Sequence, residues 1–95
     1  MFVVLLRFSE NKAKAPQFME AHKAWIQRGI EDGVFLLVGS LEPNAGGALL
    51  AHATTLPALQ ARVNEDPFVA ENVVGAEILE ITPNRTEERL SFLLG

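Results

Sequence analysis

Two short segments of this 95-residue chain are apolar at almost every position, and they limit the folds that are open to it. Residues 2–8 (FVVLLRF) and 34–41 (VFLLVGSL) are rich in β-branched and aromatic side chains and have the length of strands. Because successive residues of a strand point to opposite faces, each segment is apolar on both faces. The sequence therefore predicts a sheet whose two faces must both be buried against other elements or another chain.

Two amphipathic helices are expected between the strands. Apolar residues recur on one face of residues 16–32, and the Asp-Gly pair at the end of this stretch is typical of a helix C-terminus. A second helix, capped by Thr54 or Thr55, is expected to stop near Asp66, since proline disfavours helical geometry in the residue before it.

Two further strands complete the order β-α-β-β-α-β. They are expected at residues 48–53 and 73–82. This order is typical of the ferredoxin-like α+β fold, a four-stranded antiparallel sheet with both helices on one face. Residues 1–95 are predicted to form a single domain, in which residues 83–95 are a C-terminal tail or short helix.

A second copy of the chain is the expected cover for the open face of the sheet. Two helices shield one face, yet the first two strands are apolar on both: Val3 and Leu5 oppose Phe2, Val4 and Leu6, and Phe35 and Leu37 oppose Leu36 and Val38. The open face would exceed the few hundred Å² of apolar patch that a monomer tolerates. We therefore expect a homodimer packed sheet to sheet.

Charge and cysteine content exclude several kinds of partner and site. The formal net charge is −4 and the eight Lys and Arg are scattered, so neither nucleic acid nor a membrane surface is an expected partner. The absence of cysteine excludes disulfides and thiolate chemistry. Residues 1–6 are apolar but lack the positive flank of an export signal, so the cytoplasm is the expected location.

His22 is the first candidate for chemistry. It lies on the apolar stripe of the first helix, four residues after Phe18 and four before Ile26. Histidine exchanges a proton near neutral pH, and a neighbouring carboxylate would fix its tautomer. The alternative is a half-buried structural histidine bonded to a backbone carbonyl.

Asp66 is the candidate carboxylate. It precedes Pro67, and aspartate followed by proline is a favourable helix N-cap, which is sufficient to explain its presence. The predicted topology also places it on the same side of the sheet as His22. A carboxylate has two oxygens, so capping and an interaction with His22 can coexist.

Three more side chains are candidate substrate contacts: Ser40, Arg7 and Phe68. Ser40 lies at the end of the second strand, where it would line a cleft. Arg7 would suit an anionic substrate, with a solvated charge at the strand edge as the alternative.

No metal or cofactor is expected. His52 and the glutamates of the last strand lack the short ligand spacing of metal sites. Gly46-Gly47 has no Lys-Ser/Thr ending and no following helix, so it is predicted to be a hairpin turn and not a phosphate loop.

The chain resembles the YciI-like (YCII-related) family in three features taken together: His22, the segment DGVFLLVGSLEP (residues 32–43) and the segment NEDPF (residues 64–68). The resemblance extends over residues 1–83 and implies a fold of the dimeric α+β barrel type. It also implies that His22 and Asp66 form a His–Asp pair in a pocket. The chain departs from the family where it has Gly39-Ser40 in place of Gly-Pro, so the substrate does not transfer.

Two functions of different classes fit these residues. The first is a small cofactor-independent acid–base enzyme of lyase or isomerase type, in which His22 moves a proton on a small anionic organic molecule and Asp66 orients the imidazole. The alternative is a non-catalytic dimeric module that binds a small ligand or regulates a partner. A purely structural role would leave Asp66 as a cap and His22 as part of the core.

Overall fold

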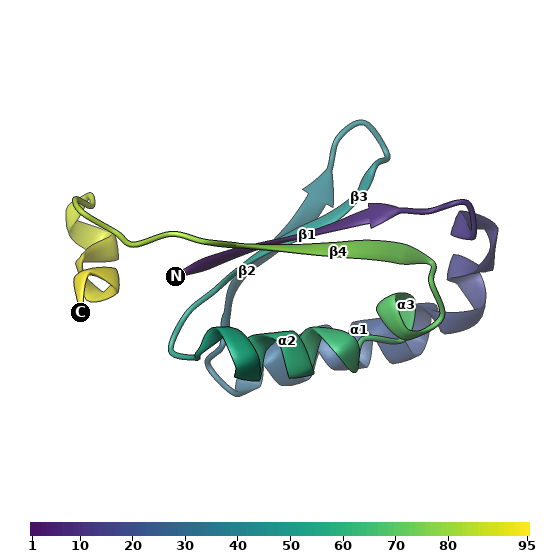
Figure 1. Ribbon diagram of the computed structural model, residues 1–95, viewed down its shortest axis with the longest axis horizontal. Coiled ribbons are helices and arrows are strands. Elements are labelled where there is room, and N and C mark those ends of the chain that lie inside the picture. The colour runs from purple at the N-terminus through teal and green to yellow at the C-terminus, as the bar shows by residue number, and fades with distance from the viewer.

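The computed structural model describes residues 1–95 and shows an α+β fold of the predicted order (Figure 1). The strands are β1 (Phe2–Phe8), β2 (Phe35–Leu41), β3 (Gly46–Ala51) and β4 (Val74–Glu80). The helices are α1 (Ala15–Glu31), α2 (Leu56–Asn64) and the short α3 (Pro67–Ala70), with 3₁₀ segments η1 (Lys12–Lys14) and η2 (Glu88–Leu94). The antiparallel sheet has the order β2-β3-β1-β4, which is the ferredoxin-like order, and α1 and α2 lie along one face.

The ends of the helices follow the capping signals of the sequence. The Thr55 hydroxyl accepts a hydrogen bond of 3.3 Å from the backbone N–H of Ala58 and starts α2. Gly33, directly after α1, has a φ of 74°, which glycine adopts without strain. Helix α2 ends at Asn64, close to its predicted end near Asp66.

The prediction that Gly46-Gly47 forms a turn was wrong, because both residues belong to β3. Gly46 pairs with Arg7 of β1 and has a φ of 134°. A Cβ atom at this position would lie 1.9 Å from the carbonyl oxygen of Leu6, so the close approach of the two strands requires glycine here.

A β-bulge in β2 corrects the predicted assignment of its faces. The pairing with β3 shifts between Phe35 and Leu37, so these two residues lie on opposite faces. Phe35 faces the helices and is buried, whereas Leu37 is opposite Leu50 on the open face. Val38, opposite the buried Leu49, then faces the helices.

The core fills the space between the sheet and the helices. Trp25 of α1 is 1 % exposed, and its Nε1 donates a hydrogen bond of 2.9 Å to the carbonyl of Arg62, which ties α1 to α2. A Cβ atom at Gly29 would lie 2.2 Å from the ring of Phe35, so α1 approaches β2 closely at this point.

The sheet face away from the helices is not covered by other elements of this chain (Figure 1). It exposes large apolar side chains beside the ion pair of Arg7 with Glu77. Leu37 is 55 % exposed and Leu79 is 43 % exposed. This is the surface that the sequence assigns to a second copy, and the homodimer remains a prediction.

The C-terminal tail lies beyond the end of β4 and stands apart from the sheet and helices (Figure 1). Its 3₁₀ segment η2 exposes about half of Leu90, Phe92 and Leu94. The ring of Phe92 contacts His52 edge to face, with 5.6 Å between centroids. Nowhere in the chain is there a helix with the length and apolar character needed to cross a membrane.

Candidate active site

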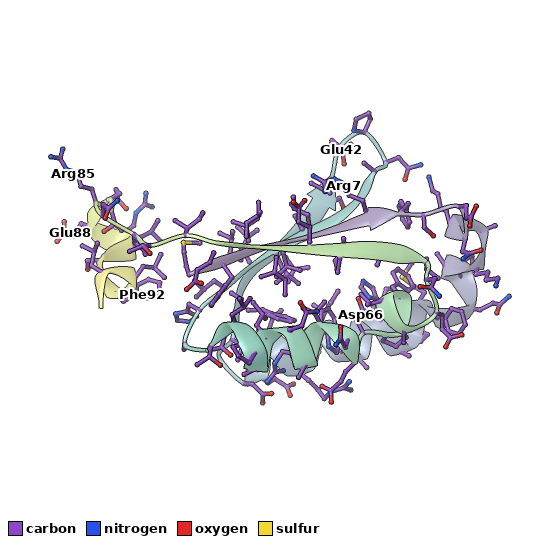
Figure 2. All side chains as sticks on the ribbon, viewed as in Figure 1. Arg7, Glu42, Asp66, Arg85, Glu88 and Phe92 are labelled. Atoms are coloured by element: carbon purple, nitrogen blue, oxygen red, sulfur yellow. The ribbon has the colours of Figure 1, made fainter.

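His22 and Asp66 form the pair that the sequence predicts. The Nδ1 atom of His22 lies 2.7 Å from Oδ1 of Asp66, although 44 residues separate them in the chain. The Asp66 side chain is fully buried, and that of His22 is 14 % exposed. Figure 2 shows Asp66 in the helical layer, between the end of α2 and α3.

The D-P-F turn holds Asp66 in place by a helix cap. Oδ1 of Asp66 accepts a hydrogen bond of 3.0 Å from the backbone N–H of Phe68, and Pro67 takes the first position of α3. The backbone carbonyl of Asp66 also accepts from the N–H groups of Val69 and Ala70. Capping and pairing therefore coexist, and both use the same oxygen atom.

The aromatic part of the same turn fixes the plane of the imidazole. The ring of Phe68 stacks on His22 with 3.9 Å between centroids and 4° between planes. Trp25 lies on a second side, with a centroid distance of 6.0 Å. Because a carboxylate only accepts hydrogen bonds, Nδ1 is the nitrogen that carries the proton, and Nε2 of the neutral imidazole keeps its lone pair.

The second carboxylate oxygen has no partner in the protein. Oδ2 of Asp66 is buried and makes no hydrogen bond. Burying a charged oxygen without a partner costs free energy, and a solvent-exposed cap would avoid this cost. A catalytic role is one of the explanations for a buried polar atom of this kind.

A cavity of about 360 Å³ adjoins the pair, between the sheet and α1. Ten of the 16 residues that line it are hydrophobic, so its walls suit an apolar ligand body. Gly47 shares the helix-facing side of the sheet with Leu6 and Ser40 and leaves space because it has no side chain. The only polar side chains in the lining are those of His22, Lys23 and Ser40.

Of the candidate substrate contacts, Ser40 and Phe68 line this cavity and Arg7 does not. Leu6 is buried and points toward the helices. Because successive side chains of a strand point to opposite faces, Arg7 points away from the helices. On the open face Arg7 pairs with Glu77 at 2.7 Å, and Figure 2 shows it on the opposite side of the sheet from Asp66. The cation of the cavity is therefore Lys23 and not Arg7.

Lys23 could not be singled out from the sequence, because the helical pattern places it on the polar face of α1. Its only signal is its position next to His22, at the border of the apolar stripe. His52 lies outside the cavity lining, and no group of three His, Asp or Glu side chains is placed to hold a metal ion.

Comparison with known proteins agrees with this architecture. The family model of the YCII-related domain matches residues 1–84. The chain belongs to the YCII-related family. Both His22 and the D-P-F turn lie within the matched part of this YCII-related protein, whereas most of the C-terminal tail lies outside it. No curated protein matched the sequence.

A solved structure shares the fold of this YCII-related protein. It is 5-chloro-2-hydroxyhydroquinone dehydrochlorinase (TftG) from Burkholderia phenoliruptrix AC1100, in complex with 2,5-dihydroxybenzoquinone. The two chains are 14 % identical, the match covers 85 % of this chain and 93 % of that chain, and the TM-score is 0.68. At this level of identity the similarity establishes a common fold.

Proposed function

We propose that this YCII-related protein is a small enzyme of lyase or isomerase type that moves a proton on a small anionic organic molecule without a cofactor. The observation that carries the proposal is the 2.7 Å contact between His22 Nδ1 and Asp66 Oδ1 at the wall of an apolar cavity. A buried carboxylate, a histidine that it orients, and a space for a ligand beside them are the parts that general base catalysis needs.

In this mechanism the Nε2 atom of His22 accepts a proton from the substrate. Asp66 keeps the imidazole in the tautomer whose Nε2 is free, and its charge stabilises the imidazolium that forms. The stacked ring of Phe68 restricts rotation of the imidazole and so holds Nε2 in one orientation. Positioned proton transfer of this kind supplies about 10²–10⁴-fold in rate.

The structural neighbour supports the reaction class. Dehydrochlorination is an elimination, and the neighbour was solved with a small cyclic molecule bound. Loss of HCl removes a proton and a chloride ion, and removal of the proton is a step that a His–Asp pair can perform. For the present protein, a small ring compound is a candidate substrate on the same grounds, because the cavity is mostly apolar.

We also propose that the protein works as a homodimer through the open sheet face. The half-exposed Leu37 and Leu79 belong to an apolar surface that this chain leaves uncovered. A second copy presents the same surface and is a self-complementary cover for it.

The catalytic proposal can be tested without knowledge of the natural substrate. The protein is incubated in D₂O with 2,5-dihydroxybenzoquinone, and exchange of the ring protons is followed by NMR. In parallel, 5-chloro-2-hydroxyhydroquinone is assayed for release of chloride. The variant His22→Asn keeps a donor toward Asp66 but has no base at Nε2, and it should lower either rate by about 100-fold or more.

The second histidine of the chain provides a matched control. His52 lies outside the cavity, so His52→Asn should keep the wild-type rate. An active wild type whose rate survives His22→Asn would contradict the mechanism. Probes that bind in the cavity without exchange or turnover would instead favour the non-catalytic ligand-binding alternative.

A further inference from the structure

A cation in the cavity wall would favour an anionic ligand beside His22. Asp66 is a fully buried carboxylate whose Oδ2 has no partner, so its negative charge is poorly screened by water. An anion next to the neutral imidazole would be repelled by this charge. A positive side chain in the cavity wall offsets the repulsion.

Lys23 is the only Lys or Arg in the lining of the cavity. It follows His22 directly on α1, and its side chain is exposed. None of the four ion pairs of the protein includes Lys23, although Glu20 stands three residues earlier on the same helix, at a spacing that permits pairing. Its ammonium group is therefore free to bind a ligand.

Ser40 offers a neutral polar contact from the opposite wall. It lies on the helix-facing side of β2, opposite Gly47, and lines the same cavity. A ligand in this cavity would therefore adjoin Lys23 from α1, Ser40 from the sheet and the imidazole of His22, while the remaining side chains of the lining are hydrophobic.

From this arrangement we infer that Lys23 is the specificity-determining residue of the site, and that the cavity selects an apolar, ring-sized body with one anionic group over its neutral isostere. This inference rests on the proposed function for the position of the reacting atom, but it concerns binding and not proton transfer. An ion pair with the exposed Lys23 should favour the anion by up to about fivefold in affinity.

Benzoate and benzamide are suitable probes, because they have the same shape and differ in charge. Their dissociation constants are measured by NMR titration or calorimetry for the wild type, Lys23→Gln, Lys23→Arg and Lys14→Gln. The wild type, Lys23→Arg and Lys14→Gln, whose lysine lies outside the cavity lining, should all prefer benzoate. Lys23→Gln should bind both probes with equal affinity, leave the affinity for benzamide unchanged and keep the wild-type thermal unfolding temperature.

A preference for benzoate that persists in Lys23→Gln would overturn the inference, and so would a wild type that binds neither probe or binds both equally. Either result leaves the exchange assay with His22→Asn unaffected. Conversely, a rate that survives His22→Asn would remove the catalytic proposal while the charge preference at Lys23 stands. The two failures are therefore distinguishable.

Discussion

Asp66 caps α3 and carries the negative charge beside His22, and substitution can separate these two roles. Asparagine can replace the cap but not the charge, whereas alanine can replace neither. The side chain of Asp66 accepts from the N–H of Phe68 at 3.0 Å and contacts Nδ1 of His22 at 2.7 Å. The amide side chain in the variant Asp66→Asn still offers an oxygen at this position, and asparagine is as good an N-cap as aspartate.

The magnitudes follow from these contacts. Loss of a cap costs about 0.5–2 kcal/mol, and loss of a hydrogen bond to a charged group costs about 1.5–3 kcal/mol. The same substitution also removes the unpartnered Oδ2, and the relief of its burial cost offsets part of these two losses. Asp66→Ala should therefore lower the free energy of unfolding by about 2–3 kcal/mol. Asp66→Asn should lower it by about 1 kcal/mol or less, yet reduce turnover by about 100-fold or more, because the charge that stabilises the imidazolium is gone.

Urea denaturation followed by fluorescence measures the stability. The chain has a single tryptophan, Trp25, which is 1 % exposed and packs near His22, so its emission reports on unfolding around the site. If Asp66→Asn destabilised the protein as much as Asp66→Ala, the cap would not account for the stability. If Asp66→Asn kept both stability and full turnover, the orienting role of the carboxylate would be refuted.

Two further predictions concern the cavity and the open face. Gly47→Val should fill part of the cavity and weaken benzoate binding at least tenfold. It should have little effect on the thermal unfolding temperature, because a Cβ atom at this position meets only the Gly39 carbonyl oxygen, at 3.4 Å. Unchanged affinity for benzoate would place the ligand elsewhere. Leu37→Lys combined with Leu79→Lys should convert a homodimer into a monomer in light scattering, since like charges would meet on the apolar face. A wild type that is monomeric at high concentration would contradict the dimer.

The order of elements was predictable because its signals are local or repeated along the chain, whereas the His22–Asp66 pair, 44 residues apart, was predicted through the family resemblance. The stripe of α1, the Thr55 cap and the Asp-Pro step each act within a few residues, and the family resemblance linked His22 to Asp66. The stacking of Phe68 on His22 was not predicted, since it depends on how α3 packs against α1.

The wrong predictions, of the faces of β2 and of the Gly46-Gly47 turn, concern features that depend on how neighbouring strands pair. The bulge between Phe35 and Leu37 is set by register with β3, and strict alternation along one strand cannot reveal it. Gly46 has the composition of a turn, but the nearby carbonyl of Leu6 is what requires glycine there. For Arg7 the sequence left a substrate contact and a solvated charge open, and the structure places it outside the cavity, paired with Glu77.

The shared oxygen of Asp66 has a dynamic consequence. Helix α3 comprises only four residues, so it is too short to be stable on its own and depends on its cap and on packing. When this helix opens locally, the backbone of Phe68 leaves Oδ1 and the aromatic ring leaves the imidazole in the same event. His22 therefore stays aligned only while α3 remains folded. Hydrogen exchange of the Phe68 amide, which bonds to Asp66 Oδ1, reports how often α3 opens.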